Sequence, residues 1–353
     1  MNRTYRTRRI TPRREDAAAR RGGKTRRQDA AADGPVPDRR AGGNRADGSV
    51  EAMEHNESAS PAGAAAPTGA APASPAEVTA RHDAIRARID DAARAAGRDP
   101  SEIRLLPVSK TVPAAAVLAD WPALRDAGCL TLAENRVQEA AAKAAFFSDA
   151  AGGDSAGAAG VTGAAGAAAP AIAPMPRWAV IGPLQTNKAG QLAAFADEFQ
   201  ALDRPKVAAA LQRRLAGGTG GPGAANDITG RTLDVLIQVN TSHEPQKAGI
   251  APDDAEAFIA DFGRDGPYPN LRLRGFMTMA MIADPSSPDG DEDVRRCFAT
   301  LRELRDRLAP NAPDGVTLDE LSMGMSGDFE LAIAEGATTV RVGRAIFGER
   351  PKP

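Results

Sequence analysis

A lysine ends one of the apolar runs of the sequence. The stretch IRLLPVSKTVP, residues 103–113, has the pattern of a buried strand and places Lys110 shortly before Pro113, which can open a helix. An ammonium here can be a surface group whose aliphatic stem lies along the edge of the core. It can also be a functional amine at the mouth of an α/β sheet, where lysines attack aldehydes and ketones. The residues at the other predicted strand ends distinguish the two.

Two segments near the C-terminus contain residues that bind anions. In LSMGMSGDFELAIAEG, Ser322 offers a hydroxyl, and in VRVGRAIFG, Gly343 and Arg344 offer backbone N–H groups at the start of a helix, where an anion is favoured. Serine and glycine are also frequent in caps and turns that bind nothing. We favour a phosphate site because both segments follow adjacent predicted strands, the seventh and eighth, where barrels hold phosphate.

A lysine that faces a phosphate site across a barrel mouth suits a Schiff base with pyridoxal 5'-phosphate (PLP). Arg341, inside an otherwise β-branched strand, would direct a cation at the pyridine nitrogen and leave it largely unprotonated. It could instead form an ion pair with a carboxylate inside the barrel. An aldolase-type Lys110 in a phosphosugar-binding barrel also fits the phosphate site, but it gives Arg341 no role.

These residues can meet only if eight strands bring their carboxyl ends together. Eight β-type runs alternate with helical patterns along the chain, which predicts a single (β/α)8 TIM barrel. An open doubly wound sheet is the rival, but no GxGxxG follows the first strand. The predicted strands are Ile103–Ser109, Leu130–Ala133, Trp178–Ile181, Phe199–Leu202, Leu233–Val239, Leu271–Met277, Thr317–Ser322 and Thr338–Val342.

The barrel is predicted for residues 76–350. Residues 1–75 are rich in Arg, Ala, Gly and Pro and are predicted to be a disordered tail, as are two inserts in the barrel, residues 150–176 and 216–230. Without them roughly 230 residues remain, close to the ~250 of one barrel, so no second folded domain is expected. Met53 is an alternative start of translation.

Composition narrows the class of protein. Residues 1–48 carry a balance of +8 and the whole chain −2, so the remainder carries −10, which argues against nucleic acid as the main partner. No secretory signal or bilayer-length apolar run is found, so we expect a cytoplasmic protein without a membrane partner. Cys129 and Cys297 have neither disulfide nor metal-ligand spacing, and no metal is expected.

Several motifs resemble, in order and spacing, those of the pyridoxal phosphate homeostasis proteins (the YggS/PROSC-like family). These are single-domain relatives of the alanine racemase N-terminal barrel, a PLP fold of type III. The resemblance covers residues 76–350 apart from the two inserts. The motifs are PVSKT, ENRVQEA, WAVIGPLQTNK, VLIQVNTSHEPQKAGI, GFMTM and LSMGMSGDFELAIAEGATTVRVGRAIFG.

The resemblance assigns roles to the residues at the strand ends. It implies that Lys110 carries PLP as a Schiff base, that Ser322, Gly343 and Arg344 hold the phosphate, and that Arg341 faces the ring nitrogen. Many members have Thr or Ser where this chain has Arg344, so only the backbone N–H of that residue is expected to serve.

Further residues follow from the same resemblance. Asn135 and Met277 would line the cofactor, and Lys247, in the loop after strand five, would have a secondary role in handling PLP. Ala179 stands where many members have His.

The family implies a PLP-binding protein that acts in intracellular PLP (vitamin B6) homeostasis without catalytic turnover. Apo PLP-dependent enzymes are candidate partners, and we expect a monomer. A racemase needs a second base, but the only tyrosines are Tyr5 in the tail and Tyr268 before strand six, and His243 is a loop residue without a visible partner. A single-domain PLP-dependent amino-acid racemase is the alternative.

Overall fold

The computed structural model describes residues 73–151, 173–217, 228, 230–242, 244, 247–282 and 289–348. Almost all of the predicted tail and most of the two predicted inserts lie outside these residues, so their disorder stays a prediction. The first two residues of each insert are helical, because helix α3 ends at Ala151 and helix α5 ends at Gly217.

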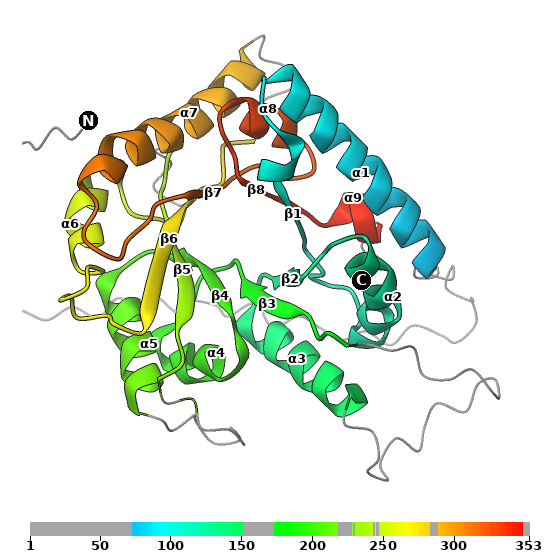
Figure 1. The fold of residues 1–353 in the computed structure, drawn as a ribbon, viewed down its shortest axis with the longest axis horizontal. Coiled ribbons are helices and arrows are strands. Elements are labelled where there is room, and N and C mark those ends of the chain that lie inside the picture. The colour runs from blue at the N-terminus through cyan, green and yellow to red at the C-terminus, as the bar shows by residue number, and fades with distance from the viewer. Residues whose placement is uncertain are drawn as a thin grey trace, which may run out of the picture. The chain divides into compact units, whose positions relative to one another are not determined.

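Eight parallel strands form a nearly closed barrel surrounded by helices, which confirms the predicted fold class (Figure 1). Around the barrel the order is β1-β8-β7-β6-β5-β4-β3-β2, as expected for repeated β–α units. The strands are β1 Arg104–Pro107, β2 Thr131–Glu134, β3 Arg177–Val180, β4 Glu198–Leu202, β5 Leu233–Gln238, β6 Leu271–Met277, β7 Glu320–Ser322 and β8 Thr339–Val342.

Helices cover the outside of the strands (Figure 1). Among the described residues, no helix combines the length and the apolar character that a membrane span needs. The α-helices are α1 Pro75–Ala95, α2 Ala114–Asp126, α3 Val137–Ala151, α4 Ala189–Phe195, α5 Pro205–Gly217, α6 Ala255–Ala260, α7 Gly290–Leu308, α8 Phe329–Ala334 and α9 Arg344–Phe347. Single 3-10 turns are η1 Pro100–Glu102, η2 Thr186–Lys188, η3 Pro252–Asp254 and η4 Ala309–Asn311.

The seventh strand is shorter than the sequence predicts. The sequence predicts a strand that begins at Thr317, whereas β7 begins at Glu320. Leu318 is fully buried and has a φ of 51°, in the left-handed region that a strand residue does not adopt. The apolar character of Leu318 therefore reflects burial in a loop.

Two of the residues that precede Lys110 belong to a small apolar cluster. Leu106 and Val108 form a small buried apolar cluster with Ala133 and Ala179, separate from the main core between strands and helices. Lys110 comes two residues after Val108, in the turn at the carboxyl end of β1.

The seam between β1 and β2 is the weakest part of the barrel wall. No ladder joins the two strands; a single bridge pairs Val108 with Ala133, and the Ser109 N–H donates to the Ala133 carbonyl at 3.0 Å. The backbone next to Lys110 is therefore held by few strand hydrogen bonds.

Side chains strengthen this seam from the helix side. The Lys143 ammonium on α3 donates to the Ser109 carbonyl at 2.7 Å and forms an ion pair with Glu134, at the end of β2. The Ser109 hydroxyl donates to the same carboxylate at 2.7 Å, and all three residues are buried. Within the described chain, Glu134 Oε2 has no hydrogen-bond partner. We call Ser109, Glu134 and Lys143 the seam clamp; it ties the ends of β1 and β2 to α3.

We predict that Lys143→Met lowers the free energy of unfolding by about 3–5 kcal/mol, because it leaves the buried Glu134 carboxylate without its cation. In Lys143→Met/Glu134→Gln that charge is gone, so the loss should be smaller than the sum of the single losses by about 2 kcal/mol. Urea denaturation of wild type, Lys143→Met, Glu134→Gln and the double variant measures the coupling energy between the two residues.

Arg136→Met is the matched control, because it breaks an exposed pair with Glu139 beside the same helix. It should cost less than about 1 kcal/mol. Strictly additive losses in the double variant of the clamp would contradict the prediction.

Candidate functional site

The carboxyl ends of β6, β7 and β8 bring three of the predicted site residues together. Met277 pairs in register with Ser322, and Ser322 pairs with Thr339, two residues before Arg341. Met277, Ser322 and Arg341 are all buried. Met277 and Ser322, which are 45 positions apart in the sequence, thus become neighbours through strand pairing.

Arg341 is a buried cation with neutral hydrogen-bond partners. It donates through Nη1 to the Ser322 hydroxyl at 2.9 Å and through Nη2 to the Thr278 carbonyl at 2.8 Å. Burial lowers the pKa of Arg341 to about 10, opposed by the charge of Asp328, so the group stays protonated at pH 7. None of the ion pairs in the described chain includes Arg341, so the sequence alternative of a barrel ion pair is not observed.

The Ser322 hydroxyl has two hydrogen-bond partners within the protein. Its hydroxyl donates to Gln200 on β4 at 2.7 Å and accepts from Arg341. Its predicted contact with a phosphate stays a prediction. Gln200 was absent from the sequence prediction, although the alternation of Glu198 and Gln200 with apolar residues in EFQAL is a signal for polar side chains on one face.

Glycines at the ends of β7 and β8 permit close backbone approach. Gly324 has a φ of 92°, and a Cβ there would meet the Phe329 Cα at 2.9 Å. A Cβ at Gly343 would lie 2.9 Å from the Val108 carbonyl oxygen. The turn at Gly343 therefore packs directly on β1, two residues before Lys110.

Lys110 lies in the turn that follows β1 and is half-buried. The next residue, Thr111, has a φ of 69°, and the Val112 N–H donates to the Ser109 carbonyl at 3.0 Å. Because that carbonyl also accepts from Lys143, the backbone on the strand side of Lys110 is fixed from two directions. Arg344 opens α9 on the other side of Gly343 and is exposed.

Lys247, in the loop after β5, is held by a hydrogen bond and an ion pair. Its ammonium donates to the Ala280 carbonyl at 3.1 Å and forms an ion pair with Glu244. It thus joins the loops that follow β5 and β6. The structure does not bring it into the hydrogen-bond network of Arg341, and His243 lies outside the described residues.

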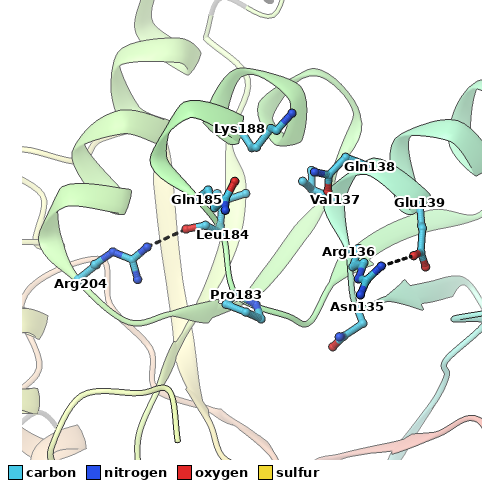
Figure 2. A pocket seen from close by; sticks show the side chains of 10 residues that line it. All are labelled: Asn135, Arg136, Val137, Gln138, Glu139, Pro183, Leu184, Gln185, Lys188 and Arg204. Atoms are coloured by element: carbon cyan, nitrogen blue, oxygen red, sulfur yellow. Dashed lines mark hydrogen bonds and ion pairs between the residues drawn. The ribbon is translucent and has the colours of Figure 1, made fainter. Parts of the chain in front are cut away.

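Asn135 lies in a separate depression between the segments that follow β2 and β3 (Figure 2). This pocket has a volume of about 600 Å³, and Arg136, Gln185, Lys188 and Arg204 contribute to its lining. Arg136 points toward Glu139, and Arg204 donates to the Leu184 carbonyl at 2.8 Å (Figure 2). The pocket includes Asn135 but none of the other predicted cofactor residues.

The backbone beside this pocket is closely packed at Gly182. A Cβ at Gly182 would lie 2.0 Å from the Asn135 carbonyl oxygen, so only glycine fits between β3 and the start of α3. In the part of the chain with described coordinates, no group of three or more His, Cys, Asp or Glu side chains is arranged to hold a metal ion.

Comparisons with known proteins agree with this geometry. Residues 81–351 match the family of the alanine racemase N-terminal domain. A pyridoxal phosphate homeostasis protein of Pseudomonas aeruginosa is 39% identical over 267 residues, which cover 75% of this chain and 93% of the relative. Its counterpart in Vibrio cholerae is 36% identical over 266 residues, with the same coverage of 75% and 93%.

A solved structure with a bound cofactor is also similar. PipY of Synechococcus elongatus PCC7942, determined with PLP bound, aligns with a TM-score of 0.56 and 29% identity over 77% of this chain and 100% of its own. The match of motifs, the nearly full coverage of the relatives and the barrel architecture agree. This chain therefore belongs to the family of pyridoxal phosphate homeostasis proteins, built on the barrel of the alanine racemase N-terminal domain.

Proposed function

We propose that this chain binds PLP, holds it covalently on Lys110 and acts in PLP homeostasis without turnover of a substrate. The names of its relatives and the PLP-bound structure of PipY support this proposal. The observation that carries it is the convergence of three features where β1 meets β8. These are the lysine at the end of β1, the Gly343 turn that packs on Val108, and the Arg341 guanidinium on β8.

The residues present fit the three chemical groups of PLP. Lys110 offers an amine for the aldehyde, and the backbone at Gly343 and Arg344 offers N–H groups for the phosphate. Ser322 is already engaged with Gln200 and Arg341, so we assign the phosphate mainly to backbone donors. When bound, PLP supplies an aldehyde that reacts reversibly with amines and a ring that withdraws electrons.

Arg341 favours storage of the cofactor over catalysis on it. Its pKa of about 10 keeps it protonated at pH 7, so it donates a hydrogen bond and accepts none. A donor facing the pyridine nitrogen holds that nitrogen unprotonated, which weakens the electron-withdrawing power of the ring. Reactions that need a carbanion are thereby disfavoured.

Within the described residues, Tyr268 does not supply the second base that a racemase needs near Lys110. Tyr268 precedes β6, at the amino ends of the strands, and it is buried against Phe262 with ring centroids 5.2 Å apart. Burial raises the pKa of Tyr268, so its phenol stays neutral. Tyr5 and His243 lie outside the described residues. No observation favours the racemase alternative; the recipient enzymes, the monomeric state and the cytoplasmic location stay predictions.

We predict that the purified protein loaded with PLP has a visible imine band and that Lys110→Ala lacks it. The variant should retain PLP about 100-fold more weakly, because the covalent bond is lost. Borohydride reduction followed by peptide mass spectrometry locates the attachment. Lys188→Ala, which removes another lysine at the barrel mouth, is the control and should keep the band. Attachment to a lysine other than Lys110 would contradict the proposal.

We predict that the loaded protein does not interconvert L- and D-alanine faster than free PLP at the same concentration. The reason is the weak electron withdrawal by a ring that faces Arg341, together with the position of Tyr268 at the amino ends of the strands, away from Lys110. Chiral chromatography over time measures it, and racemases of ordinary speed, about 1–1,000 turnovers per second, would be evident at once. Multiple turnovers that vanish in Lys110→Ala would overturn the non-catalytic assignment while leaving PLP binding intact.

A further inference from the structure

A chain of hydrogen-bonded polar side chains crosses the inside of the barrel. At the amino ends of the strands, Arg104 makes a bidentate contact with Glu198, at 2.8 and 3.0 Å. The Gln200 amide donates to Glu198 at 2.6 Å, and the Ser322 hydroxyl donates to Gln200 at 2.7 Å. Arg341 then donates to Ser322 at 2.9 Å, at the carboxyl ends. We call these five residues the interior relay.

The two ends of the relay fix the direction of every hydrogen bond in it. The Glu198 carboxylate can only accept, so the Gln200 amide must turn its NH2 group toward Glu198 and its oxygen toward Ser322. The Ser322 hydroxyl must then donate to Gln200, which leaves its lone pairs for Arg341. A guanidinium can only donate, so Arg341 completes the chain without conflict.

Because the relay is buried from Glu198 to Arg341, the loss of any hydrogen bond between these residues raises the free energy of the folded protein. Gln200 and Ser322 are 0% exposed and Glu198 is 5% exposed, so water cannot replace a missing partner. If the Gln200 amide were lost, the Ser322 hydroxyl hydrogen would have no acceptor in the relay, so nothing would hold the hydroxyl in the orientation that presents its lone pairs to Arg341. The guanidinium would then keep only the Thr278 carbonyl, at 2.8 Å, as a firm acceptor.

We propose that Glu198 and Gln200 are positioning residues, which act through Ser322 to set the orientation of the Arg341 guanidinium toward the cofactor ring. This inference rests on the proposed function, because it takes the ring nitrogen of PLP as the group that Arg341 faces. In this proposal the effect of Glu198 and Gln200 is on the donor that Arg341 presents.

Three variants test the relay. Gln200→Leu removes the amide at similar volume. Glu198→Gln keeps the shape but lets both amides turn, so the direction of the chain is lost. The exchange variant Glu198→Gln/Gln200→Glu again places an acceptor-only group before Ser322, so it should restore the direction. Asp234→Asn is the control, because Asp234 pairs with Arg272 at the same end of the barrel, outside the relay.

The measurements are the dissociation constant of PLP, the chemical shift of an isotope-labelled ring nitrogen, and the thermal midpoint of each variant. We expect Gln200→Leu to keep PLP attached to Lys110, to bind it about tenfold more weakly, ~1.4 kcal/mol, and to shift the ring-nitrogen resonance. Glu198→Gln should shift the resonance in the same direction, and the exchange variant should return it toward wild type. Asp234→Asn should leave the resonance unchanged.

A lower thermal midpoint in Gln200→Leu with an unchanged resonance and affinity would overturn the proposal, because Gln200 would then be only a core residue. A crystal structure of Gln200→Leu without PLP in which Arg341 keeps both of its hydrogen bonds would overturn it as well. If Gln200→Leu does not fold, Glu198→Gln and the exchange variant decide by the same criteria. Failure of the proposed function is distinguishable, since wild type would then show no imine band at Lys110.

Discussion

A guanidinium lies inside the barrel, and its charge has to be satisfied by hydrogen bonds because water does not reach it. Arg341 is 4% exposed and donates to a hydroxyl and to a carbonyl, both neutral. A buried cation without these acceptors would cost several kcal/mol. The arrangement of β4, β6 and β7 around β8 can be understood from this requirement, since Gln200, Thr278 and Ser322 all serve it directly or through one neighbour.

The same requirement explains why polar side chains lie inside this barrel. In many barrels, layers of branched apolar side chains fill the interior. Here Leu106, Val108, Ala133 and Ala179, from the first three β–α units, form a small apolar cluster separate from the main core. The relay runs from the ion pair between Arg104 on β1 and Glu198 on β4 to Arg341 on β8. A buried chain of hydrogen bonds with a fixed direction is suited to present one fixed donor, Arg341.

The mouth itself depends on the weakest part of the wall. The seam between β1 and β2 has one bridge, and the seam clamp compensates with a buried ion pair on its outer side. Lys110 follows this seam, next to the Gly343 turn of β8. The proposed covalent site at the junction of the first and last strands therefore combines a backbone held by side chains with a glycine turn packed closely on Val108. Both features favour holding a ligand over moving it.

Local pattern in the sequence determined the eight strands, the barrel and the place of Lys110, because apolar runs, alternation and turn residues act over a few neighbours. The residue types at the ends of the last two predicted strands pointed to Arg341 and the glycine turns, and the resemblance to the family assigned their roles. The tertiary structure alone decided which polar groups meet: Ser322 and Gln200 are 122 residues apart, and Arg104 and Glu198 are 94 apart. Such contacts depend on strand register and on closure of the barrel, which no local pattern encodes. For the same reason only the structure revealed that Leu318 bends into a loop before β7.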